Sequence, residues 1–189
     1  MTGIKTIAMA LLAALSLVGT SPALAQKVRL ATSMGDIVVQ LDKEKAPKSV
    51  DNFIQYVKAG HYDGTIFHRV IDNFMIQGGG FDPTMNQKPT RGPIPLESRN
   101  GLTNLRGTLA MARTNVPDSA TAQFFINLRD NAFLDSANSR DGNGYAVFGH
   151  VIEGMDVVDK IKTVPTTLKG GHQNVPVDPI LIKKASLEP

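Results

Sequence analysis

The feature that most constrains the fold of this chain is a series of short β-rich runs separated by clusters of turn residues. The runs cover residues 65–71, 74–77, 107–112, 123–128, 147–152 and 180–184. Earlier in the chain, residues 28–32 and 36–41 flank Met34-Gly35 and alternate apolar with polar side chains, which predicts an opening β-hairpin. Many short strands in succession favour an antiparallel barrel or sandwich over an alternating βαβ fold, and this pattern alone does not choose between barrel and sandwich.

Helical periodicity occurs in two stretches of the chain. Between residues 46 and 58, apolar side chains recur at the spacing of one helix face, with a proline in the first turn and a glycine just past the end. These residues are Val50, Phe53, Ile54 and Val57, with Pro47 and Gly60 at the two ends. A shorter helix is predicted over residues 155–162, and the Gly-, Pro- and Asn-rich stretches 81–101 and 168–179 are predicted to be long loops.

The N-terminus has the pattern of a secretory signal peptide. Lys5 supplies a positive charge, residues 7–18 are apolar, and Ala23-Leu24-Ala25 forms a small-x-small cleavage site, so cleavage is expected before Gln26. The apolar run is shorter than the roughly 20 residues that a membrane-spanning helix needs. We therefore expect a signal peptide over residues 1–25, one folded domain over residues 26–189, and no membrane association after cleavage.

Composition and spacing argue against several kinds of partner. The 20 basic and 17 acidic residues nearly balance and are scattered, which argues against nucleic acid. The four histidines do not follow a metal-binding pattern, there is no cysteine, and Gly78-Gly79-Gly80 lacks the lysine and helix that follow a phosphate-binding loop. We expect neither a metal nor a cofactor.

One arginine stands out because it lies in an apolar strand with no acidic residue beside it. Strand side chains alternate, so Phe67, Arg69 and Ile71 are expected on one face of their strand. In the next strand, Met75 and Gln77 are expected to share a face. A few hydrogen-bond donors among large apolar side chains suit a neutral, apolar ligand with some carbonyl groups better than a phosphate or a metal.

Four sequence blocks occur in order along the chain: FHRVIDNFMIQGGG at residues 67–80, GTLAMAR at 107–113, QFFIN at 123–127 and YAVFGHV at 145–151. In sequence, order and approximate spacing they resemble the cyclophilin family of peptidyl-prolyl isomerases, and especially the short exported cyclophilins of bacteria. The resemblance covers residues 27–185. It implies a mainly β fold, namely a closed eight-stranded antiparallel β-barrel capped by two α-helices. It also implies a monomer that isomerises X-Pro bonds in unfolded or exported polypeptides of the periplasm.

The chemistry of that reaction suggests a role for Arg69. Rotation of an X-Pro bond crosses a barrier of about 18–20 kcal/mol that is set by amide resonance, and no bond is broken. The proline nitrogen regains a localised lone pair in the twisted transition state, so a guanidinium held over it binds that state better than either planar ground state. Arginine suits this task because it stays charged and presents several donors in one plane. Arg69 is therefore the candidate catalytic residue.

The resemblance assigns the remaining site residues. It implies that Phe74 and Gln77 act with Arg69 in catalysis. It further implies an apolar socket for the proline ring, a rim, an amide that fixes the substrate or Arg69, and a segment that offers main-chain groups to the peptide. The socket is lined by Met75, Phe125 and Leu134 together with Phe74, and Phe133 and Tyr145 lie near its rim. Gln123 is the amide, Ala112 and Arg113 offer the main-chain groups, and Met111 is a further substrate-binding residue. His68 is interpreted as a structural residue that faces away from Arg69.

The chain also departs from some members of the family. Cyclophilins best known for binding cyclosporin have tryptophan in place of Phe133, histidine in place of Tyr145 and asparagine in place of Arg113, and this chain has no tryptophan at all. These departures predict weak cyclosporin binding rather than loss of isomerase activity. One alternative of another class remains open, namely a chaperone or adaptor that binds X-Pro segments and whose catalysis is incidental.

Overall fold

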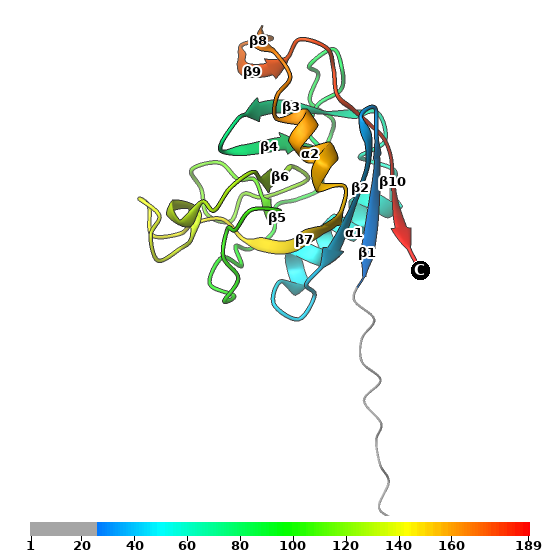
Figure 1. Ribbon diagram of the computed structural model, residues 1–189. Coiled ribbons are helices and arrows are strands. Elements are labelled where there is room, and N and C mark those ends of the chain that lie inside the picture. Colours follow the sequence, from blue (N-terminus) through cyan, green and yellow to red (C-terminus); the bar gives the residue numbers. More distant parts are fainter. Residues whose placement is uncertain (1–25) are drawn as a thin grey trace, which may run out of the picture.

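Residues 26–189 are described by the computed structural model, and their strands close into a barrel (Figure 1). The strands follow one another around the barrel in the order β1-β10-β3-β4-β6-β5-β7-β2, and neighbours are antiparallel. They are β1 Lys27–Thr32, β2 Gly35–Leu41, β3 Thr65–Ile71, β4 Met75–Gly78, β5 Thr108–Met111, β6 Phe124–Asn127, β7 Val147–Glu153 and β10 Leu181–Glu188. The predicted barrel is confirmed. The predicted signal peptide lies outside the described residues.

Strand β10 closes the barrel by pairing with β1 on one side and β3 on the other. Its pairing with β1 runs from Thr32↔Ile182 to Lys27↔Glu188, so the strand is longer than the predicted run 180–184. The additional residues at its end, 185–188, pair with β1 along the backbone ladder. The opening hairpin forms as predicted, with Thr32 paired to Gly35 across the turn.

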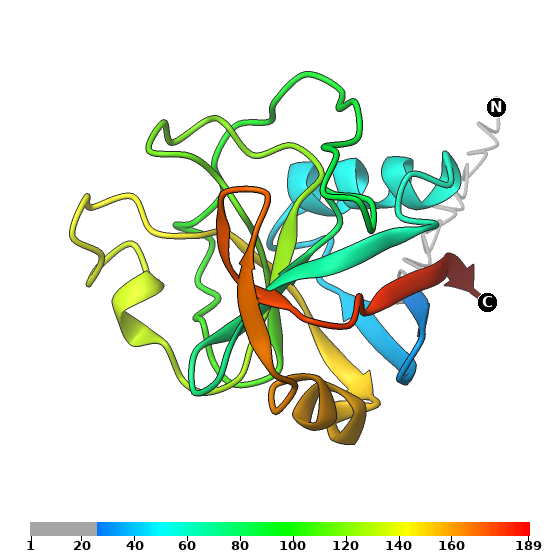
Figure 2. The same cartoon turned by 90° about the horizontal axis from the view of Figure 1, so that it is seen from above.

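The two predicted helices lie on opposite sides of the barrel (Figure 2). They are α1 Pro47–Lys58 and α2 Met155–Ile161, and each buries its apolar face in the barrel interior through residues such as Phe53 and Val158. The Phe53 ring packs against Phe124 and Phe148, with ring centroids 5.3 and 5.2 Å apart. No helix in residues 26–189 is long and apolar enough to cross a membrane.

One segment that was predicted to be a loop is a hairpin. Residues 168–179 contain most of a two-stranded sheet formed by β8 Thr166–Lys169 and β9 His172–Pro176. Gly170 and Gly171 join the strands with φ values of +57° and +79°, the conformation that tight hairpin turns favour. The prediction was wrong because β8 is largely exposed and therefore lacks the alternating burial that marks a strand. Residues 81–101 do form the predicted long loop, held by isolated bridges such as Phe81↔Gln87.

Alternating side chains on neighbouring strands build two separate clusters. Ile76, Phe124 and Ile126 point into the barrel and join its interior core. Met75 and Phe125, their neighbours in sequence, belong to a smaller cluster that also contains Ala110, Leu134 and Val147. Because strand side chains alternate, this second cluster lies on the outer face of β4, β6 and β5. The candidate site is built on it.

A bulge in β3 breaks the alternation that the sequence predicts. The pairing with β4 shifts between Phe67↔Gly78 and Arg69↔Gln77, so His68 is an extra residue in the ladder. Phe67 is consequently fully buried in the barrel interior, and it does not share a face with Arg69 as predicted. Arg69 lines a pocket on the outer face, and Ile71 packs against the outer cluster.

Candidate active site

A pocket of about 120 Å³ opens on the outer face of the barrel, where β3, β4 and β6 meet the segment after β5. It is lined by Arg69, Phe74, Met75, Gln77, Ala112, Arg113, Phe125, Leu134 and Tyr145. The structure thus brings nine of the predicted site residues together around one cavity. They come from strands and loops that are up to 76 residues apart in sequence, and the barrel closure is what joins them.

Arg69 is half-buried and is held by uncharged groups. Its Nη1 donates to Gln77 Oε1 at 3.3 Å and lies 3.9 Å from Met75 Sδ, and its guanidinium carbon is 5.9 Å from the centre of the Phe74 ring. None of the ion pairs within residues 26–189 involves this arginine. Burial lowers the pKa of Arg69, yet an arginine stays protonated at neutral pH. The pocket therefore holds a cation whose charge is not cancelled by a carboxylate.

Two glutamines orient this cation. Gln77 accepts from Arg69 through Oε1 and donates through Nε2 to Gln123 Oε1 at 2.9 Å. Gly80 leaves room for the second glutamine, because a Cβ at that position would lie 2.5 Å from Gln123 Cγ. The chain Gln123 to Gln77 to Arg69 fixes which way the amide of Gln77 faces and leaves its oxygen for the guanidinium.

Replacing Gln123 with leucine removes the acceptor for Gln77 while keeping the approximate size of the side chain. We expect kcat/KM to fall by about 5-fold, mainly through kcat, because one hydrogen bond worth about 1 kcal/mol no longer orients the amide that holds Arg69. Steady-state kinetics on a proline tetrapeptide measures this, with Gln173→Leu on the exposed strand β9 as the control. A change confined to KM would assign Gln123 to substrate binding instead.

The apolar half of the pocket is a packed socket with an aromatic rim. Met75, Phe125 and Leu134 are 1%, 4% and 7% exposed, and the Tyr145 ring meets the Phe125 ring edge-on at 5.6 Å. Phe133 does not line the pocket itself. Phe133 is 49% exposed and its ring stacks on that of Phe74, with the ring centroids 5.7 Å apart, which places it at the rim.

The residues of the segment 111–113 contribute unequally to the pocket. The side chain of Met111 is 1% exposed in the barrel interior, so Met111 does not contribute its side chain to the pocket. The N–H of Ala112 donates to Gln123 O at 3.0 Å and is not free to bind a peptide. Arg113 lines the pocket, but its guanidinium is bonded to Asp141 and to the carbonyl of Gly144.

Asn131 is a residue of the site that the sequence did not single out. It is fully buried, and its Nδ2 donates to Phe74 O at 2.9 Å and to Asn127 Oδ1 at 2.8 Å. Its own carbonyl accepts from the N–H of Leu134, in the short 3₁₀ helix η1 Ala132–Leu134. Asn131 thus ties the Phe74 wall of the pocket to the Leu134 wall. An asparagine in a turn-rich stretch resembles an ordinary loop residue, which is why it was missed.

His68 is buried and is not part of the pocket lining, which fits its structural interpretation. It is 4% exposed, and its ring packs on Phe81 at 4.6 Å. Burial, with smaller contributions from His172 and Arg69, lowers the pKa of His68 to about 4.

Among residues 26–189, no three His, Asp or Glu side chains are placed to hold a metal ion.

The low pKa of His68 predicts a loss of stability on acidification. The unfolded imidazole binds a proton below about pH 6.5 but the folded one only below about pH 4, so the free energy of unfolding falls as the pH drops through this window. The loss from this group reaches about 3 kcal/mol when both states are protonated. Urea unfolding between pH 7 and pH 4 measures it. His68→Gln should reduce the dependence without abolishing it, because burial also lowers the pKa of His61, whereas the exposed control Gln173→Leu should leave it unchanged.

Comparisons with known proteins agree with this architecture. A family model described as cyclophilin type peptidyl-prolyl cis-trans isomerase/CLD matches residues 27–187. The chain is 60% identical over 161 residues to the peptidyl-prolyl cis-trans isomerase cyp18 of Streptomyces antibioticus, covering 85% of this chain and 97% of that protein. It is 55% identical over 187 residues to the peptidyl-prolyl cis-trans isomerase A of Dickeya dadantii, covering 97% of each.

A solved structure shares the fold. The cyclophilin type peptidyl-prolyl cis-trans isomerase of Cryptosporidium parvum, crystallised in the presence of the dipeptide Ala-Pro, superposes with a TM-score of 0.75 at 29% identity. The match covers 87% of this chain and 99% of that one. The closed eight-stranded barrel with two helices is the cyclophilin fold. The chain belongs to the cyclophilin family, and its activity is that of a peptidyl-prolyl cis-trans isomerase (EC 5.2.1.8) acting on proline-containing peptides.

Proposed function

We propose that this isomerase accelerates X-Pro rotation by placing Arg69 over the proline nitrogen of the twisted amide. The observation that carries the proposal is a cation without a carboxylate partner among residues 26–189, set in the same pocket as an apolar socket. The proline ring occupies the socket formed by Met75, Phe125 and Leu134. A donor that strengthens only as the amide twists lowers the barrier without tightening the ground state.

The other residues position the reacting bond. Gln77 holds the guanidinium from one side, and the Phe74 ring lies beneath it. Phe125 and Tyr145 pack against the proline ring of the substrate, which needs no hydrogen bond from them. The Cryptosporidium protein was crystallised in the presence of Ala-Pro, and we propose that an Xaa-Pro unit of the same kind enters this pocket. No proton is transferred, so no general acid or base takes part.

The mechanism contains no titrating group and no metal, so the pH dependence of activity and its response to a chelator test it. In a protease-coupled assay with a proline tetrapeptide, kcat/KM should be nearly constant between about pH 6 and 9, because the guanidinium of Arg69 stays charged across that range. Activity should also survive EDTA. A bell-shaped profile that does not follow unfolding, or loss of activity on chelation, would contradict the mechanism. An aggregation-suppression assay on Arg69→Ala, run in parallel, separates the isomerase from the chaperone alternative.

We further propose that the protein is exported and acts on exported polypeptides in the periplasm. The proposal rests on the signal-peptide pattern of residues 1–25. If it is correct, the protein recovered from a periplasmic extract begins at Gln26 by N-terminal sequencing. Recovery of the uncleaved chain from the cytoplasmic fraction would contradict export.

A further inference from the structure

The wall of the pocket formed by Tyr145 is carried by an irregular loop that lies between η1 and β7. The loop covers residues 135–146, and the N–H of Tyr145 donates to Leu134 O at 2.9 Å. Gly144 has a φ of +67°, and a Cβ there would lie 2.5 Å from the backbone nitrogen of Ser136, so the loop folds tightly back on itself. Without a helix or strand of its own, this loop needs side-chain contacts to place Tyr145.

Arg113 supplies these contacts from the side of the pocket. Each of its three side-chain nitrogens donates to a protein oxygen: Nε to Gly144 O at 2.9 Å, Nη1 to Thr114 O at 2.9 Å, and Nη2 to Asp141 Oδ2. The guanidinium also stacks over the Tyr145 ring, with its carbon 4.7 Å from the ring centre. Only 3% of the side chain is exposed. This arginine is therefore committed to the loop and to the tyrosine.

Asp141 cancels the charge of Arg113 and braces the loop at the same time. Its Oδ1 accepts from the N–H groups of Asn143 and Gly144, at 3.0 and 3.3 Å, and from the hydroxyl of Ser139. These hydrogen bonds, together with the Arg113 guanidinium, hold the pKa of Asp141 far below its ordinary value. The carboxylate is thus ionised at every pH at which the enzyme would be assayed.

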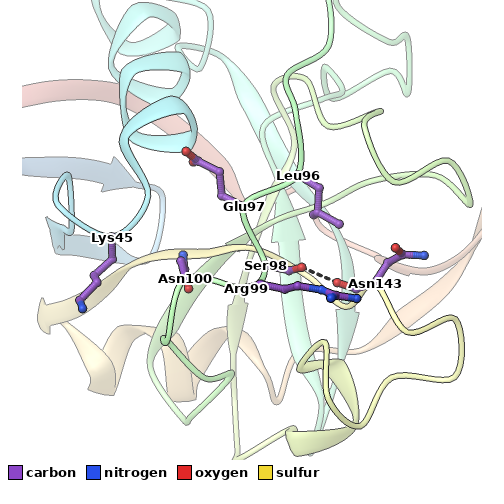
Figure 3. Close-up of a pocket in the computed structure, with 7 residues that line it drawn as sticks. All are labelled: Lys45, Leu96, Glu97, Ser98, Arg99, Asn100 and Asn143. Carbon is purple, nitrogen blue, oxygen red and sulfur yellow. Dashed lines mark hydrogen bonds between the residues drawn. The ribbon is translucent and has the colours of Figure 1, made fainter.

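The opposite side of the loop is fixed by the segment that follows residue 95. Ser98 Oγ donates to the carbonyl of Asn143 (Figure 3). In addition, Arg99 Nη2 donates to Gly142 O at 3.2 Å. Arg99 and Lys45 border an open hollow on this side, away from the pocket lining. The loop is therefore held between two supports, and Arg113 is the one that touches the aromatic wall.

We propose that Arg113 is a positioning residue for the isomerase reaction: it holds the Tyr145 ring against Phe125, and Asp141 keeps it from acting as a second cation toward the substrate. The inference rests on the proposed role of this pocket. It departs from a direct substrate-binding role, in which Arg113 would attract acidic residues beside the proline. Arg69 is then the cation that the substrate meets, and acidic flanking residues gain nothing from Arg113.

The two roles predict opposite results for Asp141→Asn. If Arg113 positions Tyr145, Asp141→Asn and Arg113→Ala both raise KM about 3- to 10-fold for proline tetrapeptides with Ala, Glu or Lys before the proline, with kcat changed less than 2-fold. The double variant is then no worse than the poorer single one. If Arg113 binds substrate directly, Asp141→Asn frees it and lowers KM for the Glu peptide alone, while Arg113→Ala raises KM for that peptide alone. That pattern overturns the proposal.

A second readout does not depend on activity. Tyr145→Trp introduces the only tryptophan of the chain, and adding Arg113→Ala or Asp141→Asn should increase its quenching by acrylamide at least 2-fold. Unchanged quenching overturns the positioning role, whether or not the wild type turns over substrate. Increased quenching in a protein without turnover contradicts the proposed function but leaves the positioning of Tyr145 by Arg113 intact. Arg113→Lys, which keeps the charge but not the planar stack, should give an intermediate KM and guards against misfolding of the alanine variant. Arg29→Gln, which breaks ion pairs on β1 across the barrel, should change neither readout.

Discussion

Replacing Arg69 with alanine or lysine is expected to lower kcat/KM by on the order of 10²–10³, while peptide affinity changes only a few-fold. The guanidinium gains its hydrogen bond to the proline nitrogen only when the amide is twisted, so the loss falls on the transition state. Lysine preserves the charge but not the planar arrangement of donors that Gln77 orients in the native pocket. A preorganised donor of this kind is worth about 3–4 kcal/mol, which corresponds to that factor in rate.

Three measurements are needed to interpret the Arg69 variants. The protease-coupled assay gives kcat/KM, calorimetric titration with an unreactive proline peptide gives the affinity, and urea unfolding shows whether the pocket remains folded. Arg29→Lys is a matched control, because Arg29 lies on β1 and its ion pairs are partly exposed. Near wild-type turnover by Arg69→Lys would show that a charge is sufficient, and the proposed geometry would then be wrong.

Most strands of the barrel were predictable from short β-rich runs in the sequence, whereas the choice of a barrel over a sandwich came from the resemblance to cyclophilins. The alternation in β4 correctly placed Met75 and Gln77 together on one face, which is the outer face of the barrel. The same reasoning failed in β3, where the extra residue His68 shifts the register and turns Phe67 inward. A bulge cannot be recognised from the alternation of apolar and polar residues along one strand. Its position depends on the pairing with β4 and on the space inside the barrel.

The site was predictable only where the family blocks supplied it. Arg69, Gln77, Met75 and Phe125 lie within those blocks, Leu134 lies between two of them, and the structure brings all five to one pocket. The partners that hold the pocket walls lie outside them. Asp141 is 28 residues from Arg113, and Asn131 is 57 residues from Phe74, so only the closed barrel and its loops make these contacts. Long-range hydrogen bonds of this kind depend on tertiary structure, and local sequence patterns do not reveal them.

Phe133 combines an exposed position with a fixed orientation. It lies in η1 and is 49% exposed, and its ring stacks on Phe74 with an angle of 28° between the ring planes. Asn131 anchors both sides of this stack, because it bonds to the carbonyl of Phe74 and to the N–H of Leu134. A larger ring at position 133 can therefore stack in the same way and present its polar edge to solvent at the rim of the pocket.

Phe133→Trp is expected to tighten cyclosporin binding by about 5- to 150-fold. Phenylalanine keeps the apolar face of the rim but has no donor, and an indole N–H adds one hydrogen bond and some aromatic area, together worth about 1–3 kcal/mol. No matching gain in turnover is expected, because Phe133 lies outside the lining of the pocket. The new side chain is the only tryptophan of the chain, so its fluorescence reports the titration directly.

The control for this titration is Leu168→Trp, which places a tryptophan on exposed strand β8, away from the pocket lining. Its fluorescence should not respond to cyclosporin, and its affinity, measured by calorimetry, should equal that of the wild type. Tight binding by the wild-type protein would show that a rim donor is not required. Unchanged affinity in Phe133→Trp would show that the stack on Phe74 holds the new ring where its N–H does not reach the ligand.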